Sequence, residues 1–332
     1  MKFYGTLGDA CRSPETLLRL FEAGMTGARL NLSHTGLEAC APLLTDVFWP
    51  AAWTAGVQAH LIIDLQGPEL RVGRLAAPVE LVQDGGAVLG TGGIPVPGVV
   101  LEEGRVGHQI SLDDSALLLE VTEKRTDSLI CKVLRGGTLK SRKSLAILGV
   151  QPNTPTLTGE DLANLDLAGE LGVTHILQPF VRGREDVETL RRALNERGLH
   201  HVKIMAKIEN RLGLDHLDEI IACADQICIA RGDLGNAMPL WELPAVQKDI
   251  ARRCVKAGRE FCLVTQLLWS MEQRSIPTRA EVLDIFNGVL DGADSLMLTG
   301  ETAVGKYPVE AMEYLVKTAR EAQLFQMEGM LE

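Results

Sequence analysis

The sequence predicts neither a signal peptide nor a membrane-spanning segment. Its first residues, MKFYGTLGDACRS, lack the apolar core of a signal peptide, and no apolar run in the 332 residues is long enough to span a bilayer. Paired cysteines are also missing from the sequence. The seven cysteines are an odd number, and no two of them have CxxC spacing. We therefore expect reduced thiols in a cytoplasmic protein, with Cys223 and Cys228 packed in the core rather than bound to a metal.

Basic segments are missing as well. The net charge is −11, and there is no run rich in Lys and Arg and no stripe of basic and aromatic residues. This composition argues against nucleic acid and anionic membranes as partners, and an anionic substrate would need a locally positive pocket. In contrast, 46% of the residues are hydrophobic, which is enough for a large core in one big domain or two moderate ones.

Strand and helix patterns alternate along most of the chain. Eight apolar runs are typical of buried parallel strands, and a helical pattern follows each of them. The strands are expected at residues 2–8, 27–33, 60–64, 174–180, 201–209, 226–233, 261–268 and 295–301. The helices are expected at residues 14–24, 37–55, 160–172, 185–198, 213–224, 245–258, 278–291 and 308–322.

Residues 69–150 interrupt this alternation. They are rich in Gly and Val, and their short alternating runs, such as LLLEVTEK and SLICKVLR, are bounded by turns such as DGG and RGG. We therefore predict a small all-β domain inserted after the third strand of a (β/α)8 TIM barrel, which is formed by residues 1–68 and 151–332 and carries the active site. An open doubly wound sheet is the competing fold, but its Gly-rich dinucleotide turn is absent from the sequence.

Charged side chains gather where the predicted strands end. Lys207 and Glu209 are two residues apart and so lie on one side of their strand, and Asp233 ends the next strand. Charges at the ends of buried strands are costly unless they serve a function. Because the carboxyl ends of barrel strands meet at one mouth, these groups are expected to hold a divalent cation and an anionic substrate there.

Several motifs resemble the pyruvate kinase family over nearly the whole chain. They are GARLNLSHT, IDLQGPELRVG, AKIEN, ARGDLG, VTQLLWSM, PTRAEVLD and LDGADSLMLTGETAVGKYPVEA, in the family's order. The resemblance implies a barrel that carries a mobile β lid, with phosphoenolpyruvate bound at the barrel mouth between the two.

The resemblance also implies roles for individual residues in phosphoryl transfer. Glu209 and Asp233 would hold Mg²⁺, Lys207 would neutralise the transferred phosphoryl group and the enolate, and Arg29 would contact the same phosphate. The backbone amides at Gly232 and Asp233 would receive the substrate carboxylate. The remaining matches are Thr265, beside the enolate carbon, and Thr299 for substrate binding; Asn31, Ser33, Asp64 and Leu65 for K⁺; and His34, Arg71 and Lys143 for ADP.

Some features depart from the family pattern. The chain stops after the eighth barrel helix, so no effector domain and no regulation by a sugar phosphate are expected, and a homodimer through the barrel is favoured over a tetramer. Gln178-Pro179 replace a small residue and a Ser, and the lid segment SRKSLAILG departs from the family's form. The nucleotide half of the site is therefore more altered than the phosphoenolpyruvate half.

The expected reaction is phosphoenolpyruvate plus ADP to pyruvate plus ATP, dependent on Mg²⁺ and, since Glu69 is acidic, on K⁺. An alternative is a paralogue that uses Mg²⁺–enolpyruvate chemistry on another acceptor or a 2-oxo acid, as an aldolase or lyase does. A non-catalytic binding module is a third interpretation. Simpler roles also stand for single residues: a structural ion pair for Lys207 and Glu209, and a solvated hairpin for Lys143.

Overall fold

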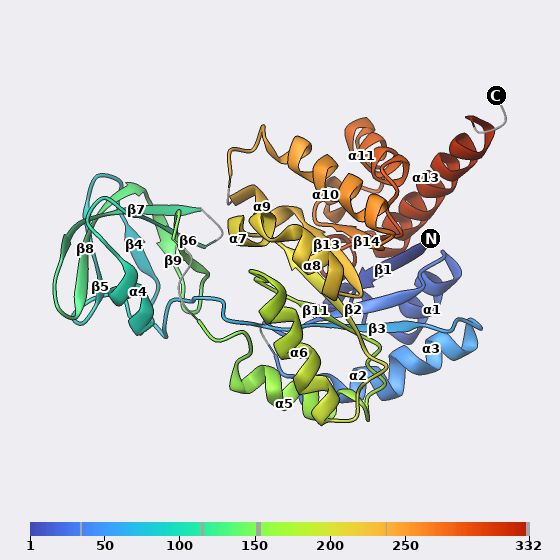
Figure 1. Ribbon diagram of the computed structural model, residues 1–332, viewed down its shortest axis with the longest axis horizontal. Coiled ribbons are helices and arrows are strands. Elements are labelled where there is room, and N and C mark those ends of the chain that lie inside the picture. The colour runs from blue at the N-terminus through green and yellow to red at the C-terminus, as the bar shows by residue number, and fades with distance from the viewer. Residues whose placement is uncertain (34, 114–115, 151–153, 237, 330–332) are drawn as a thin grey trace. The chain divides into compact units, whose positions relative to one another are not determined.

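The computed structural model describes residues 1–33, 35–113, 116–150, 154–236 and 238–329. The chain divides into two compact units, one formed by Met1–Gly67 and Thr156–Glu332 and the other by Pro68–Pro155 (Figure 1). Each unit has its own hydrophobic core.

The larger unit is built around a closed barrel of eight parallel strands (Figure 1). Their order around the barrel is β1-β15-β14-β13-β12-β11-β3-β2, and every neighbouring pair is parallel. The strands are β1 (Lys2–Thr6), β2 (Gly27–Asn31), β3 (His60–Asp64), β11 (His175–Gln178), β12 (Lys203–Ile208), β13 (Gln226–Ala230), β14 (Phe261–Val264) and β15 (Ser295–Met297). The predicted (β/α)8 TIM barrel is confirmed.

Helices follow the strands along the chain and surround the barrel (Figure 1). They are η1 (Asp9–Cys11), α1 (Pro14–Glu22), α2 (Leu37–Leu43), η2 (Leu44–Phe48), α3 (Trp49–Thr54), α5 (Gly159–Ala168), α6 (Arg184–Glu196), α7 (Arg211–Asp215), α8 (Leu217–Cys223), α9 (Arg231–Asn236), α10 (Leu243–Ala257), η3 (Trp269–Glu272), α11 (Arg279–Leu290), α12 (Gly300–Ala303) and α13 (Pro308–Gly329).

Local sequence signals explain where several helices begin. Ser13 caps α1 by accepting a hydrogen bond from the Thr16 N–H, with Pro14 at the first helical position. Thr278 starts α11 with a capping box, in which Glu281 closes the reciprocal bond. The helical region expected at residues 37–55 is confirmed: α2, η2 and α3 follow one another without a gap, and η2 is a π-helical turn.

Apolar side chains fill the barrel interior. Alternate residues of the strands point inward, and the interior cluster consists of Tyr4, Ile62, Leu177, Met205, Cys228, Ala230, Cys262, Val264 and Met297. Cys228 is therefore a packing residue, as its sequence context predicts, and all seven cysteines are free thiols. A second, larger cluster lies between the strands and the helices.

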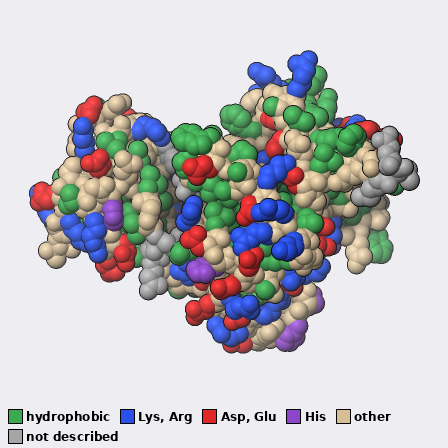
Figure 2. Space-filling view, turned by 45° about the horizontal axis from the view of Figure 1, so that its top comes forward, with side chains coloured by type: hydrophobic (Ala, Val, Ile, Leu, Met, Phe, Trp, Pro, Cys, Tyr) green, Lys and Arg blue, Asp and Glu red, His purple; other side chains and the backbone are tan. Residues whose placement is uncertain are grey.

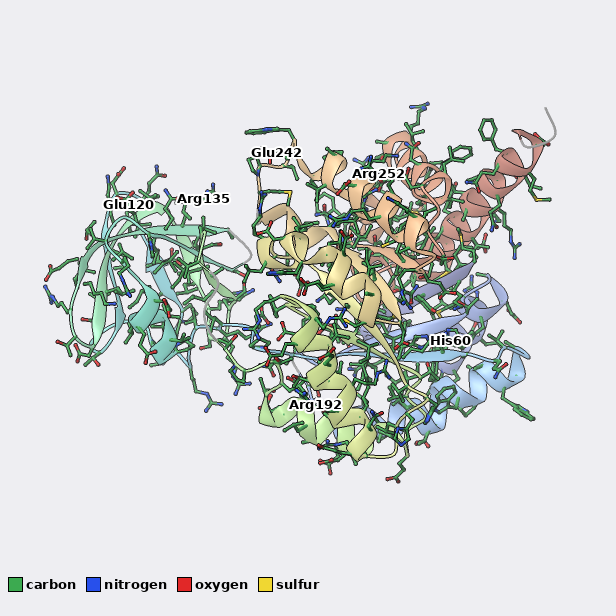
Figure 3. All side chains as sticks on the ribbon, in the orientation of Figure 1. His60, Glu120, Arg135, Arg192, Glu242 and Arg252 are labelled. Carbon is green, nitrogen blue, oxygen red and sulfur yellow. The ribbon has the colours of Figure 1, made fainter. Side chains whose placement is uncertain are left out.

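A polar layer closes the N-terminal end of the barrel. The Tyr4 hydroxyl lies 3.0 Å from His60 Nδ1, and the rings of His60 and His175 are 4.7 Å apart. Figure 3 labels His60 at the start of β3. Burial lowers the pKa of both imidazoles, that of His175 to about 3, so the two rings are neutral in the folded protein at pH 7.

The smaller unit is predominantly β. Its five-stranded antiparallel sheet has the order β10-β6-β7-β8-β5, and β4 pairs with β9. The elements are β4 (Val79–Leu81), β5 (Gly86–Gly90), α4 (Gly98–Glu103), β6 (Gln109–Leu112), β7 (Leu117–Lys124), β8 (Ser128–Arg135), β9 (Gly137–Leu139) and β10 (Leu145–Ile147). The predicted small β domain after the third barrel strand is confirmed, with one short helix in addition.

The surface carries charges of both signs. On the face drawn in Figure 2, Lys and Arg side chains lie interspersed with Asp and Glu. In the described part of the chain, no helix combines the length and apolar character needed to cross a membrane.

Candidate active site

The charged residues predicted at the strand ends meet at the C-terminal mouth of the barrel. Lys207 is the central group, with its ammonium 3.2 Å from Glu209 Oε2 and 3.6 Å from Asp64 Oδ1. Its side chain is 14% exposed. Burial alone would lower the pKa of Lys207, but the charges of Asp64, Glu209 and Asp233 outweigh burial and raise that pKa, so the ammonium stays charged.

Glu209 follows β12 directly and is 3% exposed. Its Oε1 accepts a hydrogen bond of 2.6 Å from the Phe180 N–H. Phe180 lies after β11, and its φ is positive, at 54°. Burial raises the pKa of Glu209 to about 7, and the nearby Lys207 ammonium opposes that rise. A carboxylate in this position ionises readily only when positive charge is close to it.

Asp64 and Arg29 form a second buried ion pair beside Lys207. The Nε and Nη2 atoms of Arg29 both donate to Asp64 Oδ2, at 2.9 and 2.6 Å, and Nη1 donates to Thr6 Oγ1 at 3.1 Å. The pair forms because β2 and β3 are neighbours and both side chains point into the barrel mouth. The sequence placed Arg29 beside a phosphate and Asp64 beside K⁺, and it did not foresee that the two residues contact each other.

Two buried carboxylate oxygens in this cluster are left without a hydrogen-bond partner among the described residues. They are Glu209 Oε2 and Asp64 Oδ1, and both face the Lys207 ammonium. Buried carboxylate oxygens that accept no hydrogen bond are costly, even beside an ammonium, and hard oxygen donors suit Mg²⁺ and K⁺. In the described ranges, no group of three or more His, Cys, Asp or Glu side chains is arranged as a metal site.

Asp233 lies in the first turn of α9, directly after the exposed Gly232. Its charge raises the pKa of both Lys207 and Glu209, which places Asp233 electrostatically in the same cluster. A Cβ built on Gly232 would lie 3.2 Å from Thr265 Cγ2, so the Thr265 side chain packs against the Gly232 backbone. The structure thus brings Gly232 and Thr265 together and places Asp233 within electrostatic reach of Lys207.

Thr299 and Glu301 occupy the neighbouring loop after β15. The Thr299 N–H and hydroxyl donate to Glu301 Oε2 at 2.8 and 3.2 Å, and the Leu268 N–H donates to Glu301 Oε1 at 3.0 Å. Glu301 is 1% exposed and joins the loops after β14 and β15. The sequence assigned Thr299 to substrate and gave no role to Glu301.

The residues matched to K⁺ lie at the ends of β2 and β3. Asn31 and Asp64 are register partners on these strands, and Asn31 Oδ1 accepts a 3.1 Å hydrogen bond from the Ser33 N–H. The Leu65 N–H donates to the Leu177 carbonyl at 3.2 Å. These contacts place the four residues in one small region of the barrel.

Two of the residues matched to ADP lie in the smaller unit, and each has an acidic partner. Arg71 donates to Glu69 Oε2 through Nε and Nη2, at 2.9 and 2.6 Å, and Lys143 lies 2.7 Å from Asp113 Oδ1. Arg71 Nη1 also donates to the Arg142 carbonyl at 2.8 Å. The third, His34, lies outside the described residues.

Comparison with known proteins gives one consistent result. The family described as "Pyruvate kinase, barrel domain" matches residues 94–312. The chain is 37% identical to a pyruvate kinase of Bacillus licheniformis, over 97% of this chain and 57% of that protein. It is 35% identical to one of Aeropyrum pernix, over 97% of this chain and 70% of that protein, and 38% identical to human pyruvate kinase PKLR, over 96% and 59%. The chain therefore spans a little over half the length of several curated relatives.

Proposed function

Since this chain belongs to the pyruvate kinase family, we propose that it transfers the phosphoryl group of phosphoenolpyruvate to ADP, giving pyruvate and ATP. The observation that carries the proposal is the Lys207 ammonium, held charged between Glu209 and Asp64 at the barrel mouth. A fixed, buried cation is what a phosphoryl group in transfer and an enolate both require, because catalysis of this reaction is mainly positioning and electrostatic stabilisation.

Glu209 and Asp233 would hold Mg²⁺. Glu209 Oε2 pairs with Lys207 but accepts no hydrogen bond among the described residues, and this and the shared electrostatics of the two carboxylates support the assignment. When bound, Mg²⁺ supplies Lewis-acid charge to the substrate oxygens. Glu209 keeps its orientation through the Phe180 N–H, and the Lys207 ammonium favours its ionised form.

Substrate binding would fall to groups around this pair. Arg29, oriented by Asp64 and Thr6, would present part of its guanidinium fork to the phosphoryl group. The exposed Gly232 lacks a side chain, so its peptide and that of Asp233 can approach the substrate carboxylate closely. Thr265 would lie by the enolate carbon and deliver its proton directly or through water, and Thr299 would line the same site.

Asn31, Ser33, Asp64 and the Leu65 carbonyl would hold K⁺. Asp64 Oδ1 accepts no hydrogen bond among the described residues, and this and the register pairing of Asn31 with Asp64 support the site. The ion pair of Glu69 with Arg71 adds no positive charge to replace a monovalent cation, which agrees with dependence on K⁺.

The smaller unit would act as the lid that contributes Arg71 and Lys143 to the nucleotide, with residues 69–150 as its extent. His34, which lies outside the described residues, stays the third predicted nucleotide contact. The acidic partners Glu69 and Asp113 would have to share these cations with ADP phosphates. This is the part of the site in which we expect the weakest affinity.

A homodimer through the barrel is part of the proposal. Leu240 and Trp241, between α9 and α10, are 69% and 82% exposed, and Leu283 on α11 is 59% exposed. Leu240 borders the same cavity as Asp284, the neighbour of Leu283 in α11. Exposed apolar side chains on adjacent elements favour burial against a second copy.

The free thiols of all seven cysteines agree with a reducing, cytoplasmic location.

The test is pyruvate formation by the purified chain from phosphoenolpyruvate and ADP with Mg²⁺, with and without K⁺. Turnover abolished in Asp233→Ala, but kept in Asp249→Ala on the exposed face of α10, would support the proposal. Absence of turnover in the wild type would refute it. If the inactive wild type still bound oxalate tightly with Mg²⁺, the enolpyruvate chemistry would act on another acceptor, as in an aldolase or lyase.

A further inference from the structure

The backbone directly after β14 is strained. Thr265 has a φ of 79° and Gln266 a φ of 55°, so two consecutive non-glycine residues occupy the left-handed region. This conformation is uncommon for any residue with a Cβ and is an outlier for a β-branched residue such as Thr265. Strained residues persist where their surroundings hold them, and they cluster at functional sites. The contacts that hold Thr265 therefore bear on its role.

Arg231 supplies those contacts. Its Nε and Nη2 atoms donate to the Thr265 carbonyl oxygen at 3.1 and 2.6 Å, and its Nη1 donates to Asp284 Oδ2 at 2.7 Å. The guanidinium is planar, so three hydrogen bonds in two directions fix its position. Its side chain is 12% exposed, and Asp284 belongs to α11. The Thr265 carbonyl is thus anchored to the helix layer through a largely buried ion pair.

The same arrangement fixes the Thr265 side chain. Arg231 and Gly232 are consecutive at the start of α9, and a Cβ on Gly232 would lie 3.2 Å from Thr265 Cγ2 and 3.8 Å from Oγ1. At the start of α9, the Arg231 side chain therefore donates to the Thr265 carbonyl, and the Gly232 backbone lies against the Thr265 methyl and hydroxyl groups. The start of α9 and the loop after β14 are thus held together.

We infer that Arg231 and Asp284 are positioning residues for proton transfer: Arg231, oriented by Asp284, holds Thr265 in the conformation that aims its hydroxyl at the reacting carbon. The inference rests on the proposed function, which places Thr265 beside the enolate. In the step concerned, a C–H bond forms at the methylene carbon of enolpyruvate as an O–H bond of Thr265 or its water breaks, and solvent returns a proton to that oxygen. Neither Arg231 nor Asp284 touches the substrate.

A cavity beside Arg231 makes this inference testable by chemical rescue. Its volume is about 610 Å³, and its lining includes Arg231, Gly232, Gln266 and Asp284. Truncation of Arg231 to Ala would extend this space toward the Thr265 carbonyl and the Asp284 carboxylate. A small guanidinium ion could then occupy the position of the lost side chain and restore the same hydrogen bonds.

The first experiment compares Arg231→Ala, Arg231→Lys and Asp284→Asn with the wild type. Turnover of phosphoenolpyruvate and the exchange of pyruvate methyl protons for deuterium are measured, with Mg²⁺ and K⁺ present. We expect Arg231→Ala to lose about 100-fold in kcat and in exchange, because small misplacements of catalytic groups cost that much, while KM for phosphoenolpyruvate changes less than about threefold. Methylguanidinium should restore at least about tenfold, and urea at the same concentration should not.

A double-mutant cycle identifies the residue through which Arg231 acts. In a Thr265→Ala background, Arg231→Ala should reduce exchange by less than about threefold, because the hydroxyl it aims is already gone. Multiplicative losses would overturn the inference, as would a loss confined to KM. Arg253→Ala is the matched control, since that guanidinium pairs with Asp218 on the outer helices and should leave both rates unchanged.

A crystal structure of Arg231→Lys separates this inference from the proposed function. The Lys side chain keeps the charge but cannot hold the Thr265 carbonyl and Asp284 together, so the φ of Thr265 should leave the left-handed region. An unchanged φ would overturn the inference even in an active enzyme. A wild-type chain without phosphoryl transfer would instead refute the proposed function, and the geometry of Thr265 would still decide the role of Arg231.

Discussion

Replacement of Lys207 with Met tests how the charged cluster at the barrel mouth is balanced. The change removes the ammonium that lies 3.2 Å from Glu209 Oε2 and 3.6 Å from Asp64 Oδ1, and it keeps an unbranched side chain of similar length. Arg29 still pairs with Asp64 Oδ2. Glu209 then has no cation within salt-bridge distance in the described part of the chain, although it is 3% exposed.

The expected loss of stability in Lys207→Met depends on pH. A buried charge left without its partner lowers the free energy of unfolding by about 3–5 kcal/mol. Glu209 can escape this cost by binding a proton, because burial already raises its pKa and loss of Lys207 raises that pKa further. The folded variant then binds a proton that the unfolded chain has released above pH 4.5, so its stability falls as pH rises, by up to about 1.36 kcal/mol per unit.

Urea unfolding at about pH 5.5 and about pH 8 measures this effect. The deficit of Lys207→Met relative to the wild type should be larger at the higher pH by at least about 1 kcal/mol. Lys248→Met is the matched control, since its ammonium pairs with Asp291 but its side chain is 53% exposed, and it should cost less than about 1 kcal/mol. A deficit of equal size at both pH values would refute this account of the cluster.

The same variant separates two roles in catalysis. If Lys207 neutralises the transferred phosphoryl group, Lys207→Met should lose about 10²–10³-fold or more in kcat, as expected for removal of a preorganised charge. Exchange of pyruvate methyl protons should survive in part, because Thr265 and the carboxylates remain. Phosphoryl transfer within about tenfold of the wild-type rate would show that Lys207 is mainly a structural partner of Glu209.

Three further predictions address the metal, the monovalent cation and the opposite end of the barrel. Glu209→Gln should weaken Mg²⁺ binding, measured by calorimetry with oxalate present, by at least about tenfold, and an unchanged affinity would remove Glu209 from the proposed site. Glu69→Lys should relax K⁺ dependence of turnover, and retained dependence would count against the role given to Glu69. Because the pKa of His175 is lowered to about 3, unfolding takes up a proton below pH 6.5. Wild-type stability should therefore fall as pH drops from 6.5, by up to about 1.36 kcal/mol per unit for this group, and His175→Gln should show a shallower fall in urea titrations.

The barrel could be predicted because its periodic signals are local. Apolar runs such as ICIA and CLV are long enough for buried strands, and capping residues such as Ser13 and Thr278 mark helix starts. The π-helical turn η2 within the helical region 37–55 was missed, since the apolar spacing gives no local sign of it. The split between α7 and α8 was missed for a similar reason, because the apolar pattern runs through both helices.

The candidate site was predictable only in outline. The period of two along β12 and the common direction of the strands place Lys207 and Glu209 together. The partners of each group depend on the stagger between strands, which no local pattern encodes, so the contact of Arg29 with Asp64 was missed. The Phe180 N–H on Glu209 and the left-handed Thr265 were missed because backbone conformation in loops is set by tertiary contacts.

The incomplete hydrogen bonding of the cluster at the mouth agrees with the proposed cation sites. Glu209 Oε2 and Asp64 Oδ1 form ion pairs with Lys207 but accept no hydrogen bond among the described residues. The opposite end of the barrel also combines satisfied and unsatisfied groups: Gln226 donates a 2.8 Å hydrogen bond to Ser295, whereas Asp291 Oδ2, after α11, accepts none. What distinguishes the mouth is that the charges of three carboxylates act on Lys207 there. A cation that bound these carboxylates would stabilise the folded state by its own binding free energy.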